Sequence, residues 1–170
     1  MSDVKSRVSE DRILDRRSRE STNLFTRLPA ASSASRSQAQ RCLQYGGGLS
    51  IVEWRTLWDL AEAGPMTIRD LASIQRTDHS LLSRALPEMR KKAYVEMHRD
   101  SRDGRQTIVE ITAKGRAAYE TAAPVMRRRR EALRAVFTEA EILTFVGLLD
   151  RFDSFLQTPA EDLLDKDRKE

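Results

Sequence analysis

The sequence predicts a mainly helical α+β fold with one β-hairpin. Apolar residues recur with helical period along most of the chain, and several of these runs follow a Ser or Thr that can cap a helix. Only residues 94–100 and 106–111 alternate apolar and polar side chains as strands do, and a glycine lies between them. The 170 residues, of which 39% are hydrophobic, are enough for one domain with a core of its own.

Composition and charge narrow the class of protein. The chain carries 30 Lys and Arg against 26 Asp and Glu, and its pI of about 9.5 predicts a basic face somewhere on its surface. Its one cysteine, Cys42, excludes an internal disulfide and fits a reducing compartment. No apolar run approaches the roughly 20 residues of a membrane span, and residues 1–20 lack the apolar stretch of a secretion signal. We therefore expect a cytoplasmic protein without a membrane partner.

The N-terminal part is expected to be a flexible tail followed by helices. Residues 1–12 are polar and predict the tail. Residues 13–48 follow a helical pattern, in which Pro29 and the "ASSASRS" segment are expected to place a break or a kink between two helical pieces. The "YGGGLS" segment then ends the second piece, because glycines favour helix termination.

Three helices are predicted in the centre of the chain. Ser50 opens the first with the spacing of a capping box, since Glu53 follows three residues later, and Gly64 ends it. Thr67 opens the second helix in the same way, and the third begins within Thr77–Ser80. The last two helices are short and separated by a brief turn, which is the arrangement of a helix-turn-helix motif.

Two positions in this motif are unusual. Arg76 stands in the turn, where a glycine would be more comfortable. Pro87 falls inside the third helix and is expected to remove its hydrogen bond to Ser83. The apolar stripe of the third helix is otherwise regular and consists of Leu81, Leu82, Ala85, Leu86 and Met89.

Two long helices are predicted after the hairpin. Thr112 caps the first, which Pro124 is expected to kink, and Thr138 with Glu141 opens the second. The apolar stripe of the second consists of Ile142, Phe145, Val146, Leu149, Phe152 and Leu156. This stripe is longer than a small domain needs for its own core, so we expect a partner helix on it. Residues 159–170 are expected to form an acidic tail.

The outward face of the third central helix carries side chains suited to DNA. These are His79, Ser80, Ser83 and Arg84. A helix is about 10–12 Å across and fits the major groove of B-DNA, which is about 12 Å wide. The hairpin tip adds Arg102, Asp103 and Arg105, and arginine is attracted by the negative potential of a narrow minor groove. Asp100 and Asp103 are expected to hold the guanidinium groups in place before binding.

Residues 49–120 closely resemble the MarR family of winged helix-turn-helix transcriptional regulators. The resemblance is carried by "EWR", "SLLSRAL" and "RDSRDGRQTIVEITAKG". Its most specific part is the hairpin, in which Asp-x-Arg is followed by a strand that ends in Thr-x-Lys-Gly. The resemblance implies a winged helix-turn-helix DNA-binding region over residues 49–115. The residues that match the family's DNA contacts are Ser80, Ser83, Arg84, Asp103 and Arg105.

The same resemblance implies a homodimer on pseudo-palindromic double-stranded DNA. Residues 13–48 and 116–158 would hold the N- and C-terminal dimerisation helices. Family members usually repress transcription and lose DNA affinity when a small molecule, often an aromatic acid, binds between their dimerisation and DNA-binding parts. The segment before Gly46 is longer and more broken than is usual in the family, so pocket residues there are not transferred.

Three side chains are candidates for an effector pocket, and two alternative functions stay open. Tyr45, Trp54 and Trp58 suit an aromatic ligand, although the same spacing suits plain core residues. Cys42 offers the alternative of a thiol-based oxidant sensor, a role that some family members have. The other alternative is a winged-helix protein-interaction module that binds its partner through the apolar stripe of residues 142–156.

No enzyme activity, metal or cofactor is expected. His79 and His98 have no Cys or carboxylate companions at the spacing of metal ligands. The sequence contains no glycine-rich phosphate loop, nucleophile elbow or catalytic carboxylate pair. We therefore expect a DNA-binding regulator without catalytic residues.

Overall fold

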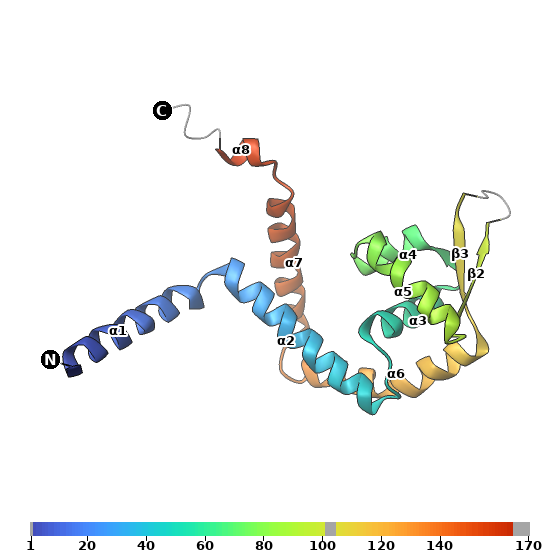
Figure 1. Cartoon of the computed structure of the whole chain (residues 1–170), viewed down its shortest axis with the longest axis horizontal. Helices are drawn as coiled ribbons and strands as arrows, with labels where there is room; N and C mark the ends of the chain where they lie inside the picture. The colour runs from blue at the N-terminus through green and yellow to red at the C-terminus, as the bar shows by residue number, and fades with distance from the viewer. Residues whose placement is uncertain (1, 101–104, 165–170) are drawn as a thin grey trace. The chain divides into compact units, whose positions relative to one another are not determined.

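The computed structural model describes residues 2–100 and 105–164, with the backbone alone for residues 2–9. It divides into two compact units, Met1–Met126 and Arg127–Glu170, and each is considered by itself. The helices and strands in chain order are α1 (Ser2–Ser21), α2 (Leu24–Tyr45), α3 (Ile51–Ala63), β1 (Met66–Thr67), α4 (Ile68–Gln75), α5 (His79–Lys91), β2 (Val95–Arg99), β3 (Thr107–Ile111), α6 (Ala113–Arg134), α7 (Glu139–Leu156) and α8 (Ala160–Leu164) (Figure 1). The predicted mainly helical fold with an antiparallel hairpin is confirmed.

The first helix occupies residues for which the sequence predicts a polar tail. α1 begins at Ser2, so residues 2–12 are helical. The described side chains of α1 are almost all exposed, and Arg16 pairs with Glu20 one turn later at 2.5 Å. Pairs at this spacing stabilise a helix by a few tenths of a kcal/mol without any core.

The chain breaks between α1 and α2 at Asn23 rather than at Pro29. Asn23 is the N-cap of α2, because its side-chain oxygen accepts a hydrogen bond from the backbone N–H of Phe25 at 3.0 Å. Pro29 lies inside α2, which also continues through "ASSASRS". A proline this early in a helix removes one backbone hydrogen bond, and the Ala and Ser residues after it are compatible with a helix. The predicted break is therefore wrong.

The central part of the chain is a winged helix-turn-helix. Helices α3, α4 and α5 pack with a three-stranded antiparallel sheet of order β1-β3-β2. Figure 1 shows β2 and β3 continuing together beyond these helices as a hairpin, which is the wing. The register pairs Val95 with Ile111 in the wing, and Met66 of β1 with Val109. The sequence does not reveal β1, since a strand of two residues is too short to show alternation.

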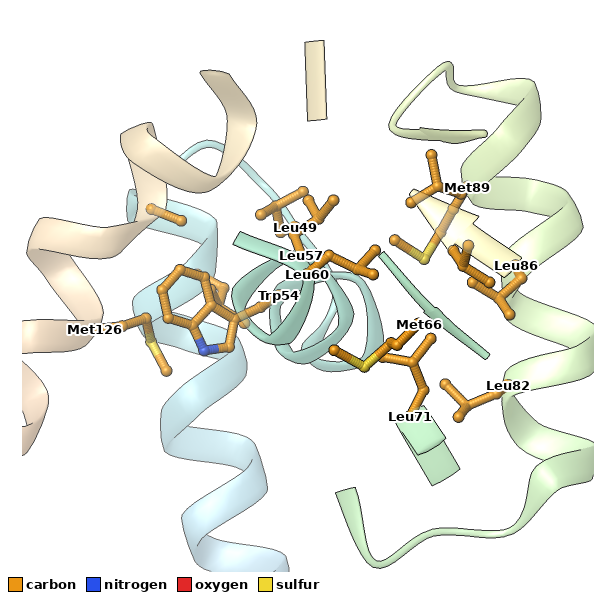
Figure 2. Packing of buried hydrophobic residues seen from close by; sticks show 14 of the residues in the cluster. Leu49, Trp54, Leu57, Leu60, Met66, Leu71, Leu82, Leu86, Met89 and Met126 are labelled. Carbon is orange, nitrogen blue, oxygen red and sulfur yellow. The ribbon is translucent and has the colours of Figure 1, made fainter. Parts of the chain in front are cut away.

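The core of this region lies between the helices and the sheet. Leu57 of α3, Leu86 of α5 and Val109 of β3 are all 0% exposed. Figure 2 shows Leu86 at one end of the core and Trp54 with Met126 at the other. Full burial of one such side chain contributes roughly 1.5–3 kcal/mol, so this core fixes the positions of α3 and α5.

Each predicted capping box is present. The pairs are Ser50 with Glu53, Thr67 with Asp70, and Thr138 with Glu141. In each, the hydroxyl accepts a hydrogen bond from the backbone N–H three residues later, and the acidic side chain accepts one from the N–H of the cap. Pro87 lies inside α5, yet the helix continues to Lys91. Its effect there is the loss of one backbone hydrogen bond, that to Ser83.

The "TAKG" segment attaches the start of α6 to the turn before β2. Thr112 Oγ1 donates a hydrogen bond to the carbonyl of Ala93 at 2.6 Å and accepts one from the N–H of Gly115 at 3.0 Å. A Cβ on Gly115 would lie 2.0 Å from the carbonyl oxygen of Tyr94, so no other residue fits there. This contact explains why the family-like motif at the end of the wing contains a threonine and a glycine.

The second unit contains the end of α6 and the helices α7 and α8. α7 has no buried residue, although it is strongly apolar. α8 is a helix of five residues within the segment for which the sequence predicts an acidic tail. Among the helices that the structure describes, none has the length and apolar character required to cross a membrane.

Candidate nucleic-acid interface

The polar face predicted to contact DNA is the exposed face of α5. Its members are His79, Ser80, Ser83 and Arg84, and all four are exposed. Leu82 and Leu86 of the same helix are 0% exposed. These leucines fix the rotation of α5 about its axis, and the helical period then leaves the four polar residues on the outside.

Two of these side chains bond back to the helix. Ser83 Oγ and Arg84 Nε each donate a hydrogen bond to the carbonyl of Ser80 at 3.1 Å. The terminal guanidinium nitrogens of Arg84 still have N–H groups to donate, and the Ser83 hydroxyl has lone pairs to accept. The face therefore presents both donors and acceptors, as the base edges of a major groove require.

A buried polar cluster holds α4 against α3. Gln75 is 4% exposed, and its Nε2 donates to Asp59 Oδ2 at 2.9 Å and to Thr56 Oγ1 at 3.3 Å. Arg55 donates to the backbone carbonyl of Gln75. Burial raises the pKa of Asp59, against the opposing effects of the Gln75 hydrogen bond and the Arg55 charge. The sequence does not signal this cluster, because polar residues on a helix usually lie outside.

The turn that follows this cluster has an unusual backbone. Arg76 has φ +47° and ψ 54°, in the left-handed region that favours glycine, as its place in the sequence suggests. A side chain in this region costs roughly 1–2 kcal/mol. Because Arg55 binds the carbonyl of the preceding residue, Gln75, α3 helps to hold the turn in this conformation.

An ion pair joins the end of α5 to the start of α3. Lys92 Nζ lies 2.6 Å from Glu53 Oε1, and Glu53 is the capping-box residue of α3. Burial raises the pKa of Glu53, but hydrogen bonds from Lys92 and Ser50 outweigh burial, so the net pKa lies below the ordinary value. Helix α5 is thereby held at both ends, at the preceding turn through Gln75 and at its C-terminal end through Lys92.

The wing approaches the start of α5. Arg102 and Asp103 lie outside the described residues, whereas Arg105 is described and exposed. Arg105 lines a hollow of about 260 Å³ together with His79 and Arg69 of α4. The N–H of Asp100 donates to the carbonyl of Gln106 at 3.0 Å, which continues the pairing of the two strands toward the tip. The structure thus brings the wing arginine and the first residue of α5 to one surface.

The aromatic effector candidates fall into different environments. Trp54 is 3% exposed and stacks on Trp58, with ring centroids 6.0 Å apart. Its second stacking partner is Tyr119 of α6 at 5.4 Å, which sequence spacing does not reveal because the two residues are far apart in the chain. Tyr45 is 89% exposed. Trp54 is therefore a core residue, which is the alternative that its spacing in the sequence also suits. Trp58 and Tyr119 are the partly buried members of the stack.

Cys42 lies on α2 and is partly buried. It packs against the edge of the hydrophobic core. Among the side chains of residues 10–100 and 105–164, no group of His, Cys, Asp and Glu is arranged to hold a metal ion.

Comparison with known proteins agrees with this geometry. The MarR family profile matches residues 47–106. The uncharacterized HTH-type transcriptional regulator YwaE of Bacillus subtilis (strain 168) is 28% identical over 110 residues, which span 65% of this chain and 64% of YwaE. The transcriptional regulator BldR of Sulfolobus solfataricus has a similar structure at 26% identity, with a TM-score of 0.65, covering 77% of this chain and 93% of BldR.

A further similar structure is that of BpsR of Bordetella bronchiseptica. It is 19% identical, with a TM-score of 0.69, and covers 78% of this chain and 94% of BpsR. The DNA binding of BpsR is regulated by 6-hydroxynicotinic acid. The matched family and fold are those of transcriptional regulators, which are not enzymes. The sequence motifs, the winged helix-turn-helix and these matches together show that residues 47–106 are similar to the MarR family of transcriptional regulators.

Proposed function

We propose that the chain is a dimeric repressor that binds a pseudo-palindromic operator and releases it when a small effector binds. The α5 helix of each protomer lies in a major groove of double-stranded DNA. The side chains that meet base edges and phosphates there are His79, Ser80, Ser83 and Arg84. Arg105, with Arg102 and Asp103 beside it in the chain, reaches the adjacent minor groove.

The hollow shared by His79 and Arg105 carries this proposal. The two residues belong to different elements, yet they line one surface between the start of α5 and the wing. A duplex that contacts one of them therefore passes close to the other. Both elements are held rigidly from behind, α5 by its buried leucines and the wing by its pairing and the Thr112 bonds.

The dimer is proposed from the apolar face of α7. The exposed apolar residues of this helix are Leu143, Phe145, Val146, Leu148, Leu149, Phe155 and Leu156. Several of them line an apolar groove of about 710 Å³ with Leu133 and Phe137. Contiguous exposed apolar surface is typical of interaction sites, and we assign a second copy of the chain to it. A twofold axis would place two α5 helices on one duplex.

An aromatic acid is the proposed effector. The aromatic stack offers a wall for such a ligand, because Trp58 and Tyr119 are partly exposed and each stacks on the buried Trp54. Tyr45 ends α2 beside the glycine segment that leads to α3, where its exposed ring would close over a ligand. The effector would act by favouring a dimer geometry whose α5 helices do not match the spacing of the operator.

Fluorescence tests the effector directly. The chain contains two tryptophans, Trp54 and Trp58, and both belong to the stack. Titration with 6-hydroxynicotinic acid, followed by related aromatic acids, should quench their emission and lower DNA affinity, and Trp58→Leu should weaken both responses. If no aromatic acid changes either the emission or the DNA affinity, this part of the proposal fails.

Selection from a random duplex library tests DNA recognition. The full chain should enrich two symmetric half-sites whose centres lie about 10–10.5 base pairs, or a multiple, apart. Arg105→Ala should then weaken binding to the selected duplex by about 1–3 kcal/mol. The control Arg41→Ala removes an exposed arginine of α2 and should leave affinity nearly unchanged. Equal affinities for wild type and Arg105→Ala would remove the wing from the interface.

The same selection separates the two alternative functions. A protein-interaction module that uses α7 would enrich no sequence, even at low salt. A thiol sensor would lose its selected duplex on addition of peroxide, and Cys42→Ser would abolish that loss. The proposed repressor should bind its duplex equally well with and without Cys42.

A further inference from the structure

A second hollow meets the start of α5. It measures about 680 Å³ and is lined by Arg36 of α2, by Arg76 and Thr77 of the helix-turn-helix turn, and by Asp78 and His79. Arg36 and Arg76 are both exposed. His79 belongs to this hollow and to the one beside the wing. His79, the first residue of α5, is therefore flanked by arginines from α2, from the turn, from α4 and from the wing.

The chemistry of this hollow suits an oxyanion. Two guanidinium groups bring two positive charges, and the carboxylate of Asp78 opposes them with one negative charge. Guanidinium groups bind phosphate oxygens through paired hydrogen bonds. The hollow is shallow and open to solvent, so it does not enclose a small molecule as effector pockets do. A phosphate on the backbone of a duplex can lie across it.

We propose that Arg36 and Arg76 together bind a backbone phosphate of the DNA whose groove α5 occupies. This inference rests on the proposed DNA binding and adds to it a contact from α2, which precedes the helix-turn-helix. A DNA contact on α2 would couple the position of that helix to DNA affinity without passing through the core. It also gives a role to an arginine in a turn where glycine would be more stable.

The salt dependence of DNA binding tests this contact of Arg36 and Arg76 with one phosphate, which we call the arginine clamp. The full chain would be titrated against a labelled duplex of mixed sequence, about 30 base pairs or roughly three helical turns long, between about 50 and 200 mM KCl. Each lost phosphate contact lowers the magnitude of the negative slope of log K against log salt by about 0.9, or by about 1.8 for a symmetric dimer. The double variant Arg36→Gln/Arg76→Gln should lower this magnitude by the full amount and each single variant by part of it, with an unchanged ratio of operator to mixed-sequence affinity.

Matched variants separate a lost phosphate contact from a damaged fold. Arg36→Lys and Arg76→Lys keep the charge and should keep most of the slope. Asp78→Asn removes the opposing carboxylate, whose side chain makes no capping hydrogen bond to α5, and should raise affinity severalfold. Arg41→Gln, on the same helix as Arg36 but outside the hollow, should leave the slope unchanged.

The outcomes distinguish this inference from the function on which it rests. The arginine clamp is wrong, and the proposed function stands, if Arg105→Ala weakens DNA binding but Arg36→Gln and Arg76→Gln have the same salt slope as Arg41→Gln. If wild type binds no duplex at low salt, both are wrong. A slope reduced by Arg76→Gln but not by Arg36→Gln overturns the contact from α2.

Discussion

α5 and α7 are both amphipathic helices, but they show opposite faces to solvent. α5 buries Leu82 and Leu86 completely and exposes its polar side, because α3 and the sheet cover its apolar side. In α7, by contrast, Leu143 is 65% exposed and Phe145 is 58% exposed. The same period in the sequence thus produces a completed core in one region and an uncovered surface in the other. The stability of the first should be intrinsic, and the order of the second should depend on a partner.

The largest expected effect is on association through α7. Phe145→Asp places a charge in the proposed apolar interface, where no partner compensates it, and should weaken self-association by at least about 3 kcal/mol, roughly a hundredfold or more. Sedimentation across a concentration series measures this. Ser154→Asp adds the same charge at an exposed polar position of α7 and is the control. Unchanged association in the Phe145 variant would contradict the assignment of this face.

Truncation of a buried side chain in the core around α5 should have the next largest effect, on the free energy of unfolding. Leu86→Ala removes a fully buried side chain of α5 and should lower the free energy of unfolding by about 2–5 kcal/mol, at every protein concentration. Leu143→Ala, on the exposed face of α7, should lower it only where the protein would otherwise associate. Urea denaturation at two concentrations checks both. A concentration-dependent loss for Leu86→Ala would remove the distinction between the two regions.

The ion pair behind α5 should have a smaller, pH-dependent effect. Glu53→Gln should cost about 1 kcal/mol near neutral pH, because Lys92 is 53% exposed and solvent screens the pair. The Glu53 carboxylate has a lowered pKa, so its contribution is complete above 4.5 and is lost as the pH falls through the folded-state pKa. The difference between wild type and variant should therefore shrink in acid. A constant difference down to pH 3 would contradict this account.

The smallest effect is expected in the turn. Arg76→Gly relieves the left-handed backbone and should stabilise the folded state by about 1 kcal/mol or less, since glycine also gains freedom in the unfolded chain. Affinity for DNA should nevertheless fall, because a phosphate-binding side chain is lost. Thermal denaturation and DNA titration of one sample measure both quantities. A variant that is less stable than wild type would show that the Arg76 side chain, rather than its backbone, supports the turn.

Much of the DNA-binding region could be predicted because its signals are local. Ser50 with Glu53 and Thr67 with Asp70 mark helix starts within four residues, and the wing strands alternate in register with their burial. The exposed face of α5 follows from the helical period of its apolar residues alone. These features depend on neighbours in sequence, and the structure confirms them.

The features that sequence missed depend on distant neighbours. Gln75 is buried only because Asp59 and Thr56 of α3 satisfy its amide. Tyr119 joins the tryptophan stack from another helix, and β1 exists only through its pairing with β3. The predicted break at Pro29 is wrong for a different reason: the chain breaks at the Asn23 cap, and Pro29 removes one backbone hydrogen bond without ending α2.

Cleavage of DNA from the wing tests the central claim most directly. The variant Arg105→Cys in a Cys42→Ser background carries one thiol, to which an iron–EDTA group is attached, and is bound to the selected duplex. If α5 and the wing of two protomers face one duplex, cleavage should appear as two clusters in the minor groove, symmetric about the centre of the operator. A single cluster, or protection of the operator without cleavage beside it, would contradict the claim.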